Sequence, residues 1–273
     1  VDLDEINMYD FYQDTNKVEV WPYTIKNADP DNCGWYNSFL HAFVYSCNVG
    51  MVRIAYGDWS GNIFGIGKES FYNYLDKFWF GKLTNIELAG ESEWFVENSS
   101  TVALSRYLNN SFWQGLLTTP LQVAAGYAPL INWWYYLKPT VVKWIFDKKN
   151  DTYIENQKQI LNQILKPETS EILKEALFNV LNQNPELWPI TYVEWYNLWG
   201  KSWTSQISYK WKYQQWIWWT NASFVWIITK DDPKYVVIIQ IRRPRSSIWW
   251  WQTAGKVFWD IAKFLVNYSL MVK

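Results

Sequence analysis

The chain has 273 residues and a mass of 32.7 kDa, which is long enough for one large domain or two small ones. A hydrophobic fraction of 49% with a charged fraction of 19% excludes global disorder. The net charge of −1 argues against a dedicated nucleic-acid binder. No apolar run reaches the roughly 18 residues needed to cross a bilayer.

The first residue and the cysteines give little direct information about the cellular compartment. Val1 is neither an initiator Met nor part of a basic-then-apolar leader, so we expect the natural N-terminus to lie upstream. The two cysteines, Cys33 and Cys47, cannot build a disulfide framework and leave the redox compartment open.

The first half of the chain is predicted to be mainly helical. Residues 1–35 are polar and rich in turn formers, and a single apolar helical face then runs over 38–55. A second amphipathic helix is expected over 68–79, followed by a loop over 87–100. Thr119 is suited to cap a further helix that begins at Pro120.

The second half changes from helices to strands. A charged link over 148–156 leads to a helix at about 168–183. Residues rich in β-branched and aromatic types then predict strands over 204–208, 222–229 and 235–241. The turn formers at 231–234 indicate that the last two strands form an antiparallel hairpin, and a final amphipathic helix follows over 255–268.

This order of elements predicts the α+β class, with an antiparallel sheet flanked by helices and an added helical subdomain. We interpret 1–273 as one domain, with a mainly helical part at 36–186 and a part at 187–273 that holds the sheet and the last helix.

Three short motifs carry chemistry-bearing residues in a fixed order. They are Ser46-Cys47-Asn48, the stretch 112–122 that contains Phe-Trp-Gln-Gly and Thr-Pro-Leu-Gln, and Lys201-Ser202-Trp203-Thr204. The Ser-Xaa-Asn tripeptide occurs again at 60–62, so it is weak alone, whereas Lys-Ser-Xaa-Thr occurs once.

Together these motifs resemble the transpeptidase domain of the class B penicillin-binding proteins, the D,D-transpeptidases that cross-link peptidoglycan. Residues 231–273 are similar to the closing unit of that family, so the resemblance covers nearly the whole chain. It implies the fold shared by serine β-lactamases and penicillin-binding transpeptidases, incomplete at the N-terminus.

The resemblance implies roles in serine acyl transfer for five residues. Ser46 would pass a proton towards the leaving amine, and Asn48 would hold the donor peptide and orient the catalytic lysine. Lys201 would supply positive potential for the substrate carboxylate, to which Ser202 and Thr204 would donate hydrogen bonds. The Thr204 backbone N–H would form part of the oxyanion hole.

The family's nucleophile, the serine of Ser-Xaa-Xaa-Lys, has no counterpart here, because no Ser is followed three residues later by Lys. We expect it upstream of Val1, together with a membrane anchor. The chemistry requires no metal or cofactor. The resemblance implies stem peptides and β-lactams as ligands, and a membrane glycosyltransferase and division or elongation proteins as partners. It also implies a location at the extracytoplasmic face of the membrane.

Tryptophan is anomalous, since the chain has 22 Trp and only 12 Gly. Several tryptophans stand where the resemblance expects Gly, namely Trp113, Trp133, Trp134, Trp195, Trp199, Trp203, Trp250 and Trp251. Our hypothesis is a gene that reads UGA as Gly, translated with a table that reads UGA as Trp. We therefore expect poor folding and no activity of the polypeptide as written. We assign Trp203, with Ser202 and Thr204, to substrate binding, on the strand expected to pair with the donor peptide. Its indole would fill the cleft or wedge this strand away from the nucleophile. The turn at 249–251 is expected to expose apolar surface.

Two other functions compete with this one. The tryptophans could form the platform of a non-catalytic glycan-binding module, or the chain could be a serine β-lactamase or β-lactam sensor of the same superfamily. His41 is the only histidine. We therefore expect no His-based triad, and we assign His41 to helix packing or a hydrogen bond beside the cleft.

Overall fold

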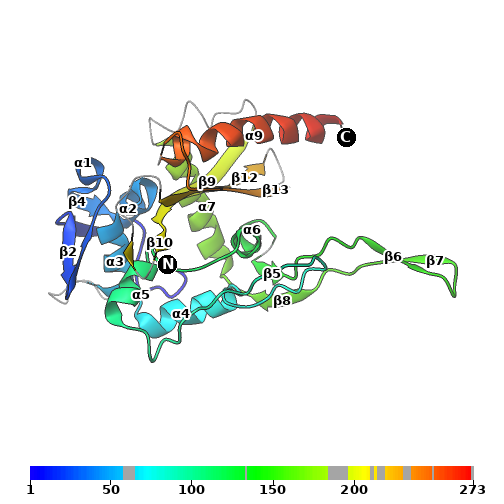
Figure 1. Cartoon of the computed structure of the whole chain (residues 1–273), viewed down its shortest axis with the longest axis horizontal. Helices are drawn as coiled ribbons and strands as arrows, with labels where there is room; N and C mark the ends of the chain where they lie inside the picture. Colours follow the sequence, from blue (N-terminus) through cyan, green and yellow to red (C-terminus); the bar gives the residue numbers. More distant parts are fainter. Residues whose placement is uncertain are drawn as a thin grey trace.

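A computed structural model describes the chain except for residues 58–64, 133, 184–195, 210–211, 214–218, 230–234, 248 and 272–273. A three-stranded sheet lies between one long helix, α9, and the remaining helices (Figure 1). No helix in the described residues combines the length and the apolarity needed to cross a bilayer.

The part that precedes the sheet is built from short strands and helices. In chain order they are β1 Phe11–Asp14, β2 Lys17–Val20, β3 Tyr23–Lys26, α1 Pro30–Cys33, β4 Trp35–Ser38, α2 Phe39–Tyr45, α3 Asn48–Tyr56, α4 Lys68–Lys77, α5 Leu104–Asn110, α6 Pro120–Tyr127, η1 Ala128–Leu130, β5 Tyr135–Leu137, β6 Trp144–Asp147, β7 Thr152–Glu155, β8 Ile160–Gln163 and α7 Pro167–Asn182.

The last part of the chain holds the long strands and the final helix. Its elements are β9 Asn197–Gln206, β10 Ser208–Tyr209, β11 Lys212–Tyr213, β12 Thr220–Thr229, β13 Tyr235–Arg242, η2 Trp250–Gln252 and α9 Ala254–Met271.

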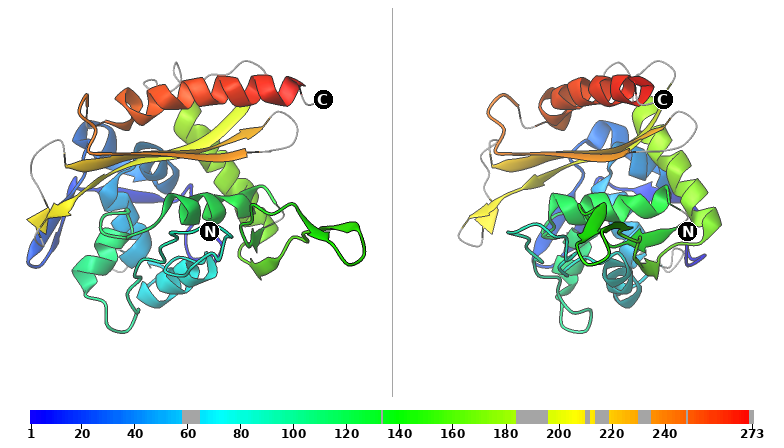
Figure 2. Two further views of the ribbon diagram at one scale, coloured as in Figure 1. Left: turned by 45° about the vertical axis from the view of Figure 1, so that its right-hand side comes forward. Right: turned by 90° about the vertical axis from the view of Figure 1, so that its right-hand side faces the viewer.

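The sheet has the order β13-β12-β9, and both pairs of neighbours are antiparallel. Alternate residues of β12 are buried on opposite faces. Phe224 and Trp226 belong to the core under α9, where both rings contact Phe258, whereas Val225 and Ile227 face the helical part. Figure 2 shows α9 along one face of the sheet and α6 on the other side. The helix α7 runs beside β9, and its Val180 and Leu181 join the core under α9. The predicted α+β class with an antiparallel sheet is confirmed.

Most predicted elements are found. The helices over 68–79, 168–183 and 255–268 are α4, α7 and α9, and residues 87–100 are free of helix and strand. The strands over 222–229 and 235–241 are the antiparallel pair β12 and β13, whose turn at 231–234 lies outside the described residues. The strand that we predicted from 204 begins at Asn197, because Leu198, Gly200 and Ser202 alternate as buried positions before it.

Two segments contain strands that the composition does not indicate. Residues 1–35 hold β1, β2 and β3, in which alternate side chains, including Tyr12, Val18 and Val20, are buried against the core. The charged link at 148–156 is part of the β6–β7 hairpin, which extends away from the body of the protein (Figure 1). Its side chains are largely exposed, so it lacks the one-sided apolar pattern that reveals a half-buried strand.

Backbone conformation separates the tryptophans into two groups. Among the described residues, five have a positive φ of 54° to 79°, namely Trp35, Trp79, Trp94, Trp113 and Trp134. Glycine adopts this region without steric cost, whereas a bulky side chain there is an outlier. Trp113 and Trp134 are thus glycine-like in conformation, as our hypothesis expects, whereas Trp199, Trp203 and Trp250 do not have a positive φ. Trp133, Trp195 and the side chain of Trp251 lie outside the described residues.

The expectation of an exposed aromatic turn at 249–251 is wrong for Trp250. This side chain is buried and stacks on Phe224 with 4.4 Å between ring centroids, in the core between the sheet and α9. The preceding Trp249 is 38% exposed. The Trp250 ring is therefore buried by the aromatic core beside it, although the local sequence resembles an exposed turn.

The predicted cap of α6 is present. The Thr119 hydroxyl accepts the Gln122 backbone N–H, and the Gln122 side chain accepts the Thr119 N–H, which completes a capping box. Thr119→Ala should lower the free energy of unfolding by about 1 kcal/mol in urea titrations. Thr101→Ala, in an exposed loop, should leave it nearly unchanged, and equal stability of the two variants would contradict this role for Thr119.

Candidate active site

Ser46 lies at a corner between two helices. It ends α2 with φ 58°, in the left-handed region, and the Cys47 N–H donates back to the Ala42 carbonyl. The expectation of one helix through the Ser-Xaa-Asn motif is therefore wrong, because a left-handed residue reverses the chain before α3 begins at Asn48. As a result the Ser46 side chain is exposed rather than packed along a helix.

Lys201 reaches this corner from the sheet. It lies in β9 opposite Val225, and its ammonium group donates a hydrogen bond to the Ser46 hydroxyl across 155 positions of sequence. The same Nζ atom lies 5.7 Å from the centroid of the Phe43 ring. Two predicted site residues are thus brought into direct contact by the fold.

The environment of Lys201 changes its acid–base behaviour. Although the residue as a whole is only half-buried, its ammonium group is desolvated, and this burial lowers the pKa of Lys201 to about 7. Lys201 therefore exchanges a proton near neutral pH, and a bound anion would favour its charged form.

Asn48 is close in sequence but is bonded elsewhere. Its Nδ2 donates to the Lys26 carbonyl at 2.7 Å, so this amide nitrogen anchors the start of α3. Its Oδ1 atom is an acceptor that a substrate amide N–H could use. The role of Asn48 towards substrate and lysine remains a prediction.

The other three predicted residues follow Lys201 along β9. Strand alternation puts Trp203 on the same face as Lys201 and puts Ser202 and Thr204 on the opposite face, where Ser202 is buried and Thr204 is exposed. β9 is the edge strand of the described sheet, so a peptide laid along it would meet side chains from both faces. Substrate binding by Ser202, Trp203 and Thr204 stays a prediction.

Two tryptophans that stand at expected glycine positions meet beside Lys201. Trp113 and Trp203 stack with 5.8 Å between ring centroids, and Trp113 also packs edge-on against Phe80 at 5.8 Å. The stretch 112–122 therefore lies next to β9, and Gln114 Oε1 accepts the Gln206 N–H at 3.3 Å. Filling of the cleft by Trp203 stays a prediction.

Cys33 and Cys47 were not predicted to pair. The two form a disulfide with their Cα atoms 5.5 Å apart, which ties α1 to the residue that follows Ser46. Their being the only two cysteines, one of them inside the Ser-Xaa-Asn motif, was the available signal, but a spacing alone does not establish a pair.

His41 has a structural position. Its Nε2 is 2.6 Å from the Asn32 carbonyl oxygen, and its ring lies 4.5 Å from that of Tyr45. These contacts fit the expected packing and hydrogen bonding of His41 on α2.

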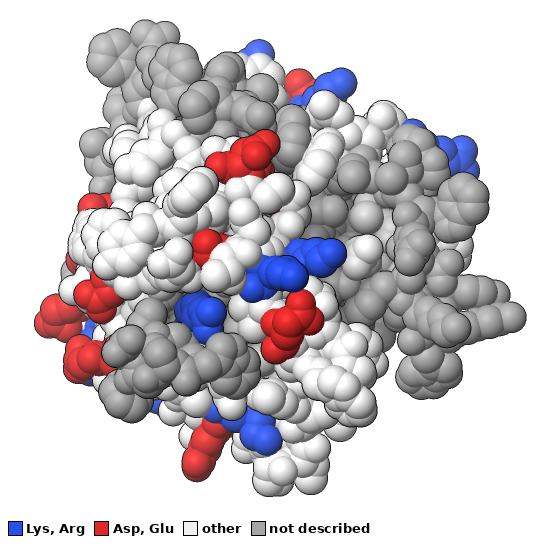
Figure 3. All heavy atoms as spheres, turned by 90° about the vertical axis from the view of Figure 1, so that its left-hand side faces the viewer, with Lys and Arg blue, Asp and Glu red and all other residues white. Residues whose placement is uncertain are grey.

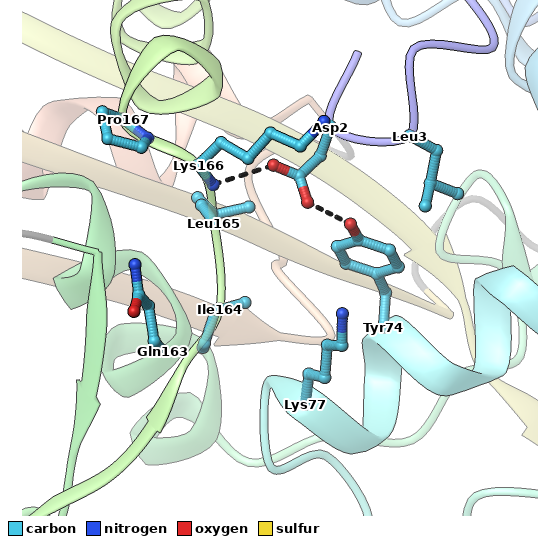
Figure 4. Close-up of a pocket in the computed structure, with 9 residues that line it drawn as sticks. All are labelled: Asp2, Leu3, Tyr74, Lys77, Gln163, Ile164, Leu165, Lys166 and Pro167. Carbon is cyan, nitrogen blue, oxygen red and sulfur yellow. Dashed lines mark hydrogen bonds between the residues drawn. The ribbon is translucent and has the colours of Figure 1, made fainter.

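A hollow of about 530 Å³ lies away from these residues, between the N-terminal segment, α4 and the start of α7 (Figure 4). Asp2 accepts hydrogen bonds there from Lys166 N–H, Thr169 and Tyr74. Partial burial opposes ionisation, but these donors together lower the pKa of Asp2. Its carboxylate is therefore satisfied as a cap of α7.

The charges on the face shown in Figure 3 are mixed. The described Lys and Arg side chains alternate with Asp and Glu, and they form no continuous basic stripe on this side. The mixture matches the nearly neutral overall charge. It does not resemble the basic surface that nucleic-acid binding requires.

A family model described as the penicillin binding protein transpeptidase domain matches residues 5–263. Stage V sporulation protein D of Bacillus subtilis is 27% identical over 85% of this chain, and the penicillin-binding protein PbpB of Mycolicibacterium smegmatis is 28% identical over 82%. The chain spans 34% of the length of each of these relatives.

Solved structures of penicillin-binding proteins share the fold. Penicillin-binding protein 3 of Mycobacterium tuberculosis, complexed with aztreonam, superposes with a TM-score of 0.81 at 21% identity, covering 98% of this chain and 59% of that one. Penicillin-binding protein 2X of Streptococcus thermophilus superposes with a TM-score of 0.75 at 22% identity, covering 89% and 36%. The predicted fold, common to penicillin-binding transpeptidases and serine β-lactamases, is confirmed.

Proposed function

Because the chain belongs to the penicillin-binding protein transpeptidase family, we propose that it forms part of a D,D-transpeptidase that cross-links peptidoglycan by serine acyl transfer. The contact between the Lys201 ammonium and the Ser46 hydroxyl carries this proposal, since it couples a cation to a proton-carrying group. We propose that residues 1–273 act as one transpeptidase domain.

The reaction would proceed in two acyl-transfer steps. A nucleophilic serine, which these 273 residues do not supply in a Ser-Xaa-Xaa-Lys motif, attacks the penultimate D-alanyl carbonyl of a stem peptide. The bond to the terminal D-Ala breaks, and this residue leaves as an amine after it gains a proton. An amine of a neighbouring stem then attacks the acyl-enzyme, which forms the cross-link and frees the serine.

Ser46 suits the proton transfer in the first step. A hydroxyl both donates and accepts, so it can pass a proton to the leaving amine while it accepts another hydrogen bond. Lys201 donates to Ser46 Oγ, which leaves the hydroxyl proton available to another acceptor. Asn48 would hold the donor peptide through its Oδ1 atom and help to orient the catalytic lysine.

Substrate binding would use the edge of β9. The terminal carboxylate of the stem peptide meets the positive potential of Lys201 and accepts hydrogen bonds from Ser202 and Thr204. The Thr204 backbone N–H would contribute to the oxyanion hole. The Trp203 indole, on the same face of β9 as Lys201, would reduce the space beside this edge. β-Lactams would bind at the same edge of β9, because they resemble the D-Ala-D-Ala terminus. They would then trap the enzyme as an acyl-enzyme.

The disulfide supports a location outside the cytoplasm. Disulfides persist in oxidising compartments, and the Cys33–Cys47 disulfide includes the middle residue of the Ser-Xaa-Asn motif. We propose that the protein acts at the extracytoplasmic face of the membrane, anchored by a segment upstream of these residues. Its partners would be a membrane glycosyltransferase and proteins of division or elongation.

The full product of the gene, expressed from its own start codon, tests the function. Fluorescent penicillin should label it covalently, and peptide mapping should place the label on the serine of a Ser-Xaa-Xaa-Lys motif. Binding to purified glycan strands without any covalent label would contradict the proposal and support the glycan-binding module. Rapid hydrolysis of the label would instead favour a β-lactamase.

The lowered pKa of Lys201 predicts the pH dependence of ligand binding. A ligand carboxylate pairs with the charged lysine, so its affinity should fall as pH rises through about 7 and the free lysine loses its proton. The limiting loss is about tenfold per pH unit. Competition by a D-Ala-D-Ala peptide against fluorescent penicillin measures this effect. Lys201→Arg, which stays charged, should abolish the fall, and an unchanged profile in that variant would contradict the assignment.

A further inference from the structure

The first turn of α3 lacks a cap of its own. Cys47 occupies the N-cap position, but its sulfur is in the disulfide and its side chain caps no backbone N–H. Instead, Asn27 Oδ1 accepts the Val49 N–H at 2.9 Å from 22 positions earlier in the chain. A side chain from the loop after β3 therefore does the work of an N-cap.

The amide of Asn27 is held in one orientation. The residue is buried, and its Nδ2 donates to Asp14 Oδ1 at 2.9 Å and to Asn16 Oδ1 at 3.0 Å. Because both of these partners are acceptors, the nitrogen must face them and the oxygen must face α3.

Asp14 holds the amide nitrogen of Asn27 in place. It is 3% exposed and accepts, besides Asn27, the Asn16 N–H at 2.7 Å and the Tyr12 hydroxyl at 2.9 Å. Burial, followed by the nearby carboxylate, raises the pKa of Tyr12, so this phenol stays a donor. Three donors thus hold a buried carboxylate in place.

A second link joins the same loop to the same helix. The Lys26 carbonyl accepts the Asn48 side chain, so consecutive residues, 26 and 27, bind consecutive residues, 48 and 49. A Cβ atom added to Gly50 would lie 2.6 Å from the Tyr12 hydroxyl oxygen, which shows how closely α3 packs on this group. Ser46 lies just before this clamped turn.

We propose that Asn27 is a positioning residue of the acyl-transfer site, and that together with Asp14 it sets the place of Ser46 relative to Lys201. This inference rests on the proposed function for its significance, but the contact that it concerns can be measured without acyl transfer. Asn27 touches neither Ser46 nor Lys201 through a hydrogen bond of its own and acts through the start of α3.

The experiment measures the titration of Lys201 in the full gene product. The lysines are reductively methylated with ¹³C, and Lys201→Arg assigns the resonance by NMR. In Asn27→Ala the Ser46 corner should loosen and admit water to the ammonium group, so the pKa of Lys201 should rise by about one pH unit. Thr119→Ala removes a helix cap elsewhere and should leave this pKa unchanged.

Two further variants separate positioning from stability. Asn27→Asp keeps an acceptor for Val49 but sets a carboxylate against Asp14, so it should resemble Asn27→Ala. Combining it with Asp14→Asn restores a donor–acceptor pair between positions 14 and 27 but leaves the new carboxylate against Asn16 Oδ1, so the double variant should shift the pKa of Lys201 less than Asn27→Asp alone. If Asn27→Ala leaves the pKa of Lys201 unchanged, the positioning role is wrong, whatever the effect of this variant on stability. Penicillin labelling tests the proposed function separately.

Discussion

Lys201→Ala should slow covalent labelling of the full gene product by fluorescent penicillin by at least about 100-fold at pH 7. The variant removes the cation that attracts the ligand carboxylate and the donor that orients the Ser46 hydroxyl. Both losses fall on the acylation step, so labelling rate is the quantity to measure. Overall folding, followed by circular dichroism, should be retained, because Lys201 is half-buried as a residue and is not among the buried core side chains.

Matched variants show whether the two residues act together. Lys263→Ala, on the exposed side of α9, should label at the original rate. Ser46→Ala should also be slow, and the double variant Ser46→Ala/Lys201→Ala should be little slower than either single one, because contacting residues are not additive. Rates that multiply, or a Lys201→Ala protein that labels normally, would refute the coupled role.

Trp35→Gly should raise the free energy of unfolding by about 1 kcal/mol in urea titrations. Trp35 has φ 79° and is 83% exposed, so glycine relieves the backbone and forfeits little packing. Trp94, at φ 54° and 46% exposed, should respond in the same direction, and the two gains should add to about 2 kcal/mol.

Trp144→Gly is the matched control. This tryptophan is 55% exposed but lies in strand β6, where glycine should cost up to about 1 kcal/mol. If Trp35→Gly destabilises as Trp144→Gly does, positive φ is not the cause of the strain.

The coding DNA tests directly whether these tryptophans are recoded glycines. We expect UGA codons at the positive-φ tryptophans and at motif positions such as Trp113 and Trp203, and UGG codons at tryptophans that are genuine. UGG at the motif positions would end the hypothesis. Trp203→Gly, made with Trp113→Gly, removes the stacked ring pair and should leave more space along the Lys201 face of β9.

Capping and periodicity rules predicted the elements that depend on residues close together in the sequence. The capping box at Thr119 and the apolar face of α9 are written within single stretches of sequence, and both are present. The approach of Ser46 to Lys201 followed from a resemblance rather than from any local pattern, because the two residues are separated by 155 positions.

The missed features depend on contacts across the chain. The left-handed φ of Ser46 breaks an uninterrupted apolar pattern, and nothing in that pattern marks the break. The cap that Asn27 provides comes from 22 residues away, so no N-cap signature lies beside α3. The same holds for the pairing of Cys33 with Cys47, which needs the fold to bring α1 to the motif.

The distance between Ser46 Oγ and Lys201 Nζ tests the central claim most directly. It can be measured in a crystal structure of the full gene product acylated by penicillin. We predict a separation of roughly 2.7–3.2 Å, with both atoms beside the bound ligand and its carboxylate against Lys201. A structure that places the two atoms on different faces of the protein, with the ligand beside neither, would contradict the account.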